Sequence, residues 1–342
     1  MNKMDIIKLV FFKLNVDGMN LGAYLAHLDQ HEGVLQFLAH GGALNDVIYG
    51  YALAGNTLEV NKWLATCDAA QQADCLGCAI RGYAKVGNFD SIYAIKDYKA
   101  HIMNTLIGLA QAGLKDKVTA ILDRNIALLS AAVEGYASCN QRELLSNLIR
   151  GTSFYPLAIY HAARAGHSEL VDYLLLQCGF DAEYKVSSAL ARSTDRDACL
   201  LFNQCASGYL AGRHFENAGT MLGRGASIVL SFSVLKDETG LPDYELYLAF
   251  LAHIKDKTLR KDVLNHSFIK SAMELLQKNP VEALKRMIKH MDMKQLNYVE
   301  VRHGLKNKSP SVIEGAMTLP YLAKVTEESL DKAASSALLH TI

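Results

Sequence analysis

The sequence is poor in proline and contains no long apolar run. Five prolines among 342 residues, and no tract rich in serine, glycine and proline, leave little room for a long disordered linker. No uninterrupted apolar stretch approaches the roughly 18 residues of a membrane span. The apolar residues 6–13 are interrupted by Lys8 and end at Lys13, which favours an amphipathic helix over a signal peptide. We therefore expect a folded, soluble chain.

The chain also carries no formal net charge, and its number of cysteines is odd. The chain has 35 Lys and Arg and 35 Asp and Glu, so its formal net charge is zero and overall charge predicts no nucleic-acid partner. The seven cysteines, an odd number, are scattered through helical patterns and indicate reduced, buried thiols. We expect a cytoplasmic, reducing environment.

Motifs of known chemistry are absent or incomplete. The sequence contains no glycine-rich phosphate loop, nucleophile elbow or kinase motif set. Cys75 and Cys78 have metal or redox spacing, with Cys67 nearby, but no second pair follows at a suitable distance. His27 and His31 share a helix face without the glutamate of a His-Glu-x-x-His motif. The sequence predicts no catalytic residue, no metal site and no cofactor.

An enzyme is an alternative interpretation, with its site in the insert or the C-terminal region. An acid and a thiol lie close together in one charged segment, and a histidine follows. The candidates are Asp195, Asp197, Cys199 and His214. A charge cluster in a solvated loop is the commoner explanation of such a segment.

A repeated pattern of paired helices runs through the first two thirds of the chain. Its clearest example, residues 159–176, consists of two short apolar helices separated by Ala165-Gly166-His167. The equivalent turn residues are Gly55, Gly87, Gly113, Asn140, Gly166 and Arg213. Five residues before them stand Gly50, Gly82, Gly108, Gly135, His161 and Gly208. Three residues before them stand Ala52, Ala84, Ala110, Ala137, Ala163 and Leu210.

Residues after each turn are apolar in the same register. Five residues after the turns stand Val60, Ile92, Val118, Leu145, Val171 and Ala218. Eight residues after them stand Trp63, Ile95, Ile121, Leu148, Leu174 and Met221. Such self-similarity at a short period predicts a stack of helix pairs, in which small residues let first helices approach closely and the later apolar residues seal the second helices.

The unit around Gly166 resembles an ankyrin repeat. Residues 162–176 read AARAGHSELVDYLLL, which is similar to the helix-turn-helix core of that family. Ala54-Gly55-Asn56 and residues 225–228 resemble, more weakly, the turn and the end of the family's repeat. The Thr-Pro-Leu-His opening is absent, and several units are shorter than the roughly 33 residues of the family. The resemblance implies an ankyrin-like α-solenoid whose hairpin fingers are reduced to loops; a generic α-solenoid is the close alternative.

These patterns predict an all-α chain with four parts. Residues 1–42 form N-terminal helices and a capping repeat, and residues 43–230 form the array, with an inserted helix and loop at about 180–201. Residues 231–243 are polar and turn-rich and read as a linker. Residues 244–342 read as a C-terminal helical domain.

Candidate binding residues follow the repeat. Tyrosine recurs four residues before several turns, and tyrosine is enriched at interfaces, although a residue kept in register is more often core. Histidines and a tyrosine flank the turn at Gly166. The candidates for contact with a protein partner are Tyr51, Tyr83, Tyr136, Tyr160, His161, His167 and Tyr209. We expect a non-enzymatic interaction scaffold.

Two features of the C-terminal region bear on where the protein acts. Lys285, Arg286 and Lys289 form a basic face on an amphipathic helix, which makes a membrane surface a possible partner. Residues 325–342 carry an acidic pair, then small and hydroxyl residues, then leucines, which resembles the export signal of Dot/Icm type IV-secreted effectors of the Legionella type. Ankyrin-like arrays are common in those effectors, so the resemblance implies secretion into a host cytosol; an ordinary last helix is the alternative. The oligomeric state is left open.

Overall fold

The computed structural model describes residues 15–16, 19–39, 42–186, 193–227, 231 and 250. The basic helix, the tail at 325–342 and the predicted C-terminal domain, except Phe250, lie outside the described residues. The described part divides into two compact units between Ala158 and Ile159, called here the N-terminal unit and the C-terminal unit.

The described residues confirm the all-α class. A short hairpin of two-residue strands, β1 (Asn15–Val16) paired antiparallel with β2 (Met19–Asn20), precedes the first described helix. The side chain of Asn20 caps that helix by accepting a hydrogen bond from the backbone N–H of Ala23 at 2.9 Å. No helix in the described ranges is long and apolar enough to cross a membrane.

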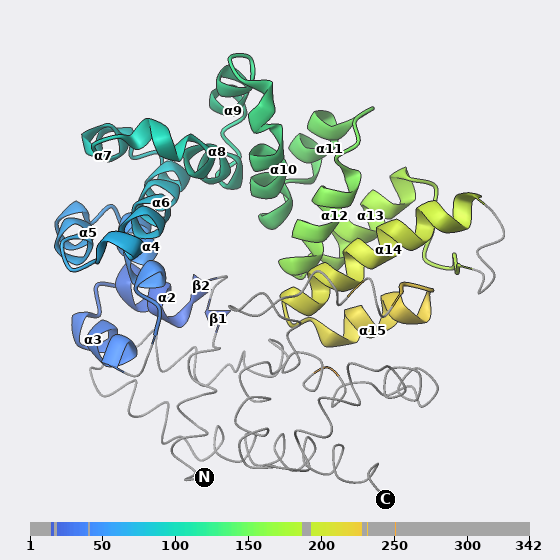
Figure 1. Cartoon of the computed structure of the whole chain (residues 1–342), viewed down its shortest axis with the longest axis horizontal. Helices are drawn as coiled ribbons and strands as arrows, with labels where there is room; N and C mark the ends of the chain where they lie inside the picture. Colours follow the sequence, from blue (N-terminus) through green and yellow to red (C-terminus); the bar gives the residue numbers. More distant parts are fainter. Residues whose placement is uncertain are drawn as a thin grey trace, which may run out of the picture. The chain divides into compact units, whose positions relative to one another are not determined.

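The helices occur as pairs along both units (Figure 1). Those of the N-terminal unit are α2 (Leu21–His27), α3 (His31–Ala39), α4 (Leu44–Leu53), α5 (Thr57–Leu64), α6 (Ala69–Val86), α7 (Phe89–Ala94), α8 (Ile102–Gln111), α9 (Lys115–Leu122), α10 (Leu129–Ser138) and α11 (Arg142–Ile149), with 3-10 turns η1 (Tyr98–His101) and η2 (Ile126–Leu128). The unit boundary falls within α12 (Tyr155–Arg164). The C-terminal unit continues with α13 (Ser168–Gln177), α14 (Ser193–Ala211) and α15 (Phe215–Gly223).

First helices pack on first helices in chain order within the N-terminal unit. The even-numbered helices contact one another in succession, α2 with α4, α4 with α6, α6 with α8 and α8 with α10. Each also contacts its own second helix, from the pair α2 and α3 to the pair α10 and α11. The core of this unit therefore lies between consecutive pairs, because neither helix of a pair can bury its apolar face alone.

The same tight turn joins the two helices of each pair. The turn residues in the described pairs have positive φ, between 55° and 79°: Asp29, Gly55, Gly87, Gly113, Asn140, Gly166 and Arg213. The next residue donates its N–H to a carbonyl five residues back, as in Asn56 N to Tyr51 O (2.9 Å) and His214 N to Tyr209 O (2.7 Å). This is the Schellman arrangement that satisfies the last carbonyls of a helix.

Burial follows the register of the turns. The residues five positions after the six turns located from the sequence are 0–1% exposed: Val60, Ile92, Val118, Leu145, Val171 and Ala218. The residues three positions before them are all 0% exposed. The residues eight positions after them differ, since Leu174 and Met221 are buried while Trp63, Ile95, Ile121 and Leu148 are only half-buried.

Glycine lies where consecutive first helices cross. A Cβ atom placed on Gly135 of α10 would lie 2.6 Å from the carbonyl oxygen of Ile107 and 2.5 Å from Cβ of Ala110, both on α8. On Gly82 of α6 it would lie 2.7 Å from Cβ of Ala52 on α4. These separations are too short for any side chain, so the crossing requires glycine.

The inserted segment differs from its predicted form. Residues 193–201, expected as part of a separate inserted helix, are continuous with the first helix of the last pair, so that α14 is 19 residues long. Residues 193–211 contain no proline, and their one glycine, Gly208, lies near the end of the helix. No residue in this stretch therefore breaks the helix between residues 193–201 and the residues that follow them. The rest of the described insert, residues 180–186, is an ordered loop.

A methyl group added at a helix crossing should destabilise the protein. We expect Gly135→Ala to lower the melting temperature by several degrees, because overpacking costs about 1–3 kcal/mol and each kcal/mol corresponds to roughly 2–4 °C. Calorimetry or circular dichroism measures the shift.

The matched control is Gly219→Ala in α15, where an added Cβ meets nothing within 4 Å. We expect an unchanged or raised melting temperature there, since alanine favours a helix over glycine by about 1 kcal/mol. Equal effects at the two positions would contradict the assigned crossing.

Candidate functional site

The tyrosines predicted to contact a partner lie in the interior. Tyr51, Tyr83, Tyr136 and Tyr209 are between 0% and 2% exposed. Each sits on a first helix, four residues before a turn. Their side chains pack within the core and are not available to a partner in this structure.

Burial changes the acidity of these phenols. It raises the pKa of Tyr51 and of Tyr136 to about 12, and the carboxylates of Glu59 and Asp29 add to the effect at Tyr51. The pKa values of Tyr83 and Tyr209 are also raised, again mainly by burial. The neutral phenol is therefore the form that the folded core accommodates.

The remaining three predicted contacts lie on one helix pair. Tyr160 and His161 are adjacent on α12, both half-buried, with ring centroids 5.2 Å apart in an edge-to-face arrangement. His167 is half-buried at the start of α13. The turn of this pair lies close to the turn of the next pair, because a Cβ atom placed on Gly166 would lie 2.5 Å from Cε1 of His214.

Of the two thiols on α6, Cys75 is buried and Cys78 is half-buried, and both stay protonated. Cys75 is 1% exposed, and its Sγ donates a hydrogen bond to Oδ1 of Asn45 at 2.9 Å. Burial raises the pKa of Cys75 to about 12 and also raises that of Cys78. Because the thiolate is the reactive form, neither is an activated nucleophile. The described ranges contain no group of three or more His, Cys, Asp or Glu placed to hold a metal ion.

The candidates for an enzyme do not converge. Asp195 is 2% exposed and accepts a hydrogen bond from the hydroxyl of Tyr184 at 3.0 Å, while Asp197 is exposed. Cys199 and Asp195 lie near the start of α14, whereas His214 follows its end. From Cys199, the nearest of the other three along the chain, to the end of α14 at Ala211 the helix rises by about 18 Å, so His214 is far from all three.

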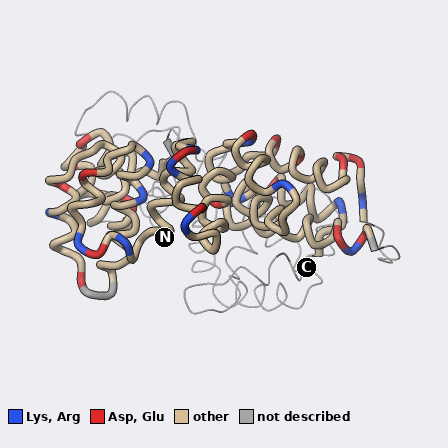
Figure 2. The backbone as a smooth tube through the Cα atoms, turned by 90° about the horizontal axis from the view of Figure 1, so that it is seen from above, with Lys and Arg blue, Asp and Glu red and all other residues tan. Residues whose placement is uncertain are grey.

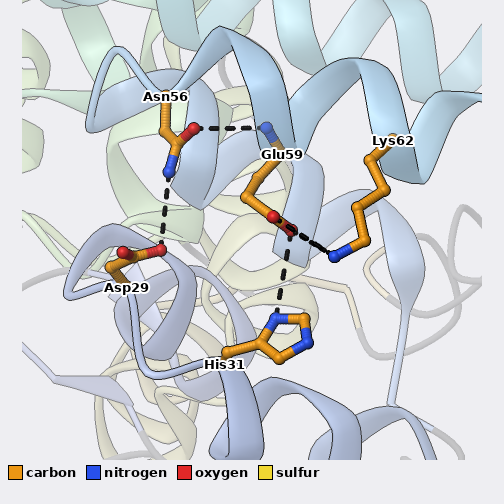
Figure 3. A network of polar contacts seen from close by, with 5 residues as sticks. All are labelled: Asp29, His31, Asn56, Glu59 and Lys62. Carbon is orange, nitrogen blue, oxygen red and sulfur yellow. Dashed lines mark hydrogen bonds and ion pairs between the residues drawn. The ribbon is translucent and has the colours of Figure 1, made fainter.

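A polar network joins the turns of the first two described pairs, α2 with α3 and α4 with α5 (Figure 3). Nδ2 of Asn56 donates to Oδ1 of Asp29 at 3.4 Å, while its Oδ1 accepts from the backbone N–H of Glu59 at 3.2 Å. The Glu59 carboxylate accepts from Nζ of Lys62 at 3.2 Å and lies 3.9 Å from Nδ1 of His31. Because these ion pairs are partly exposed, each contributes at most about 1 kcal/mol; the network holds two turns together.

An exposed aromatic cluster, which the sequence interpretation missed, lies between α7 and α9. It consists of Phe89, Tyr93, Tyr98 and Lys117, and is called here the aromatic cluster. The ring centroid of Tyr93 lies 6.5 Å from that of Phe89 and 5.4 Å from that of Tyr98. Nζ of Lys117 lies 3.9 Å from the centroid of the Phe89 ring, a cation–π contact. Tyr93 is nevertheless 61% exposed.

Local structure explains how the cluster forms. Phe89 and Tyr93 are four residues apart on α7 and so share a face, while Ile92 faces the core at 1% exposure. Helix α7 ends after six residues, and Asp97 adopts a left-handed conformation with φ of 60°. That turn brings Tyr98 of η1 back against Tyr93. The spacing of Phe89 and Tyr93 was the signal available in the sequence.

A buried arginine fixes the inserted loop. Arg224, at the end of α15, is 6% exposed, and its guanidinium lies 4.4 Å from the centroid of the Phe202 ring. Its Nε donates to the carbonyl of Tyr184 at 3.3 Å and its Nη2 donates to the carbonyl of Asp181. The N–H of Val186 donates to the Arg224 carbonyl at 2.9 Å. The loop is thus tied to the last helix pair.

Comparisons of the chain with protein-family models, with curated proteins and with solved structures find no match. Lys285, Arg286 and Lys289, the residues predicted to face a membrane, lie outside the described residues. The aromatic cluster and the half-buried residues of α12 and α13 are therefore the candidate binding surfaces that have a described geometry.

Alkaline pH should destabilise the fold through the buried tyrosines. An unfolded chain titrates its phenols near the ordinary pKa of 10, whereas burial raises the pKa of Tyr51 and Tyr136 to about 12. Between these values the unfolded chain binds fewer protons than the folded one, so the free energy of unfolding falls as pH rises. Below the ordinary pKa this contribution is fully present. Urea unfolding across this range measures the slope.

The control is the double variant Tyr51→Phe and Tyr136→Phe, which removes two of the groups that titrate. We expect its free energy of unfolding to fall less steeply with pH over the same range. A slope equal to that of the unchanged protein would show that these phenols are not buried in the native core.

Proposed function

We propose that this protein is a non-enzymatic scaffold, an ankyrin-like stack of helix pairs that binds a protein partner. Seven turns with one geometry, and buried residues at fixed offsets from them, support the stack. Glycines at the helix crossings support it as well. The connections between the described pairs contain loops and 3-10 turns in place of hairpin fingers, which agrees with a reduced form of the ankyrin plan.

The aromatic cluster is the observation that carries the proposed binding function. Tyrosine is among the residues that dominate the binding energy of protein interfaces. The ring of Tyr93 is 61% exposed, and the neighbouring rings of Phe89 and Tyr98, whose centroids lie 6.5 Å and 5.4 Å away, restrict the rotamers open to it. A side chain that is already ordered loses less conformational entropy on binding. The cluster therefore has the properties of a preorganised contact surface.

The distribution of charge is compatible with a protein partner. Figure 2 shows Lys and Arg interspersed with Asp and Glu along the described chain, and the formal net charge of the whole chain is zero. We expect specificity on the described surface to come from the shape and placement of individual side chains, because charges of both signs are interspersed along the described chain.

Photo-crosslinking tests the binding surface. We expect p-benzoylphenylalanine at position 93 to give a discrete adduct with a partner in cytosolic extract. Substituting Tyr93→Ala should then weaken that partner's affinity by about 10-fold or more, because interface tyrosines often contribute 2 kcal/mol. Isothermal titration with the identified partner measures the loss.

The matched position is Ile126 in η2, which is 69% exposed and lies outside the aromatic cluster. The crosslinker at position 126 should give no such adduct, and Ile126→Ala should leave the affinity unchanged. Equal adducts from both positions, or an unchanged affinity for Tyr93→Ala, would remove the aromatic cluster as the binding surface.

The setting that we propose is a bacterial effector delivered by a Dot/Icm type IV system to bind a host protein. It rests on the sequence of residues 325–342 alone. Deleting these residues should abolish translocation of an enzymatic reporter fusion from a donor strain that carries such a system. The control replaces residues 325–342 by a scrambled tail of the same composition. Full translocation without the tail would rule out this export signal.

A further inference from the structure

A series of side-chain hydrogen bonds crosses three consecutive first helices of the N-terminal unit. Nε of Arg81 on α6 donates to Oε1 of Gln111 on α8 at 3.2 Å. Nε2 of Gln111 donates to Oγ of Ser138 on α10, also at 3.2 Å, and that hydroxyl donates to the carbonyl of Gly135 at 3.1 Å. Gln111 is only 7% exposed, so its amide is held within the packed surface. These bonds, called here the polar ladder, connect helices that lie side by side (Figure 1).

The polar ladder orients the guanidinium of Arg81. The ladder uses Nε, and the two Nη groups at the end of the side chain are not part of it. Such a pair of N–H groups binds the two oxygens of a carboxylate through parallel hydrogen bonds. Arg81 is half-buried, so part of its side chain is accessible to a partner. A guanidinium that is already held in place loses less conformational entropy on binding.

The second half of α6 is positively charged. Residues 77–86 contain two bases, Arg81 and Lys85, and no acid. Lys85 lies one turn after Arg81 and is also half-buried. In the described part of the chain neither base forms an ion pair. The neighbouring helix α8 carries no acid or base, and α4 carries one acid, Asp46, in its first turn. An acidic group of a partner would therefore complement the charge at this end of α6.

We propose that Arg81 and the polar ladder form a carboxylate-binding site, where the protein partner places an aspartate or glutamate side chain. The two Nη groups of Arg81 bind the carboxylate oxygens, and Lys85 adds positive charge nearby. Gln111 is a positioning residue, because it acts through Arg81. The site rests on the proposed function in that it takes a protein partner. It shares no residue with the aromatic cluster, so the two surfaces can be tested separately.

Nuclear magnetic resonance on the full-length chain tests the site. With 15N-labelled arginine, we expect the Nε–H resonance of Arg81 to shift saturably when a peptide of five Glu-Ser repeats is added at low salt. The neutral peptide of five Gln-Ser repeats should cause no shift. Arg81→Gln should weaken binding of the acidic peptide by about 10-fold or more, since it removes a charge-assisted hydrogen bond. Arg81→Lys should weaken it less, because lysine keeps the charge but cannot form the bidentate contact.

Gln111→Glu tests the polar ladder. The new carboxylate can still accept from Nε of Arg81 but neutralises its charge, so we expect the acidic peptide to bind about 10-fold or more weakly while the chain stays folded. The matched control is Arg150→Gln, at an exposed arginine directly after α11, which should leave the affinity unchanged. Tyr93→Ala should also leave it unchanged, which separates this site from the aromatic cluster. An Arg81 resonance that does not shift, or equal losses for Arg81→Gln and Arg150→Gln, would overturn the proposal.

Discussion

The close approach of consecutive first helices is the constraint on which the rest of each unit depends. At these crossings the backbone of one helix lies against the carbonyl oxygens and alanine methyls of the previous one, as at Gly135 against Ile107 and Ala110. So short a separation leaves no room for a side chain, and it brings the second helices near enough for their apolar residues to be buried. The pairs can differ elsewhere. Extra residues lengthen α6 and α14 or form loops without disturbing the crossings.

The turns and the crossings support each other. The left-handed turn residue reverses the chain within two residues, which places the buried position of the second helix at a fixed offset from the crossing. Side chains also connect neighbouring turns. Asn56 donates a hydrogen bond to Asp29 of the previous turn, and the ring of His214 lies against Gly166 of the previous turn. The exposed outer sides of the second helices are free of these constraints, which is why the aromatic cluster can occupy one of them.

Much of the fold could be predicted because its strictest requirements are local. A left-handed turn selects glycine or asparagine and a tight crossing selects glycine or alanine, so both are visible in one sequence. The turn at Asp29 was missed because Tyr24 stands where most other pairs have glycine. The candidate surface could not be predicted in the same way: the recurrent tyrosines are core residues, and the aromatic cluster depends on a left-handed Asp97 and on Lys117 from another pair. Such contacts between distant segments leave no periodic pattern in the sequence.

Methyl-resolved NMR tests the stacking most directly. With alanine methyls and glycine α-protons labelled, the account predicts a strong nuclear Overhauser effect at each described crossing where an alanine faces a glycine. These pairs are Ala52 with Gly82, Ala84 with Gly108, Ala110 with Gly135 and Ala163 with Gly208. Observing all four would establish that first helices cross at one repeated geometry in both units. Their absence in a folded sample would contradict the account at its foundation.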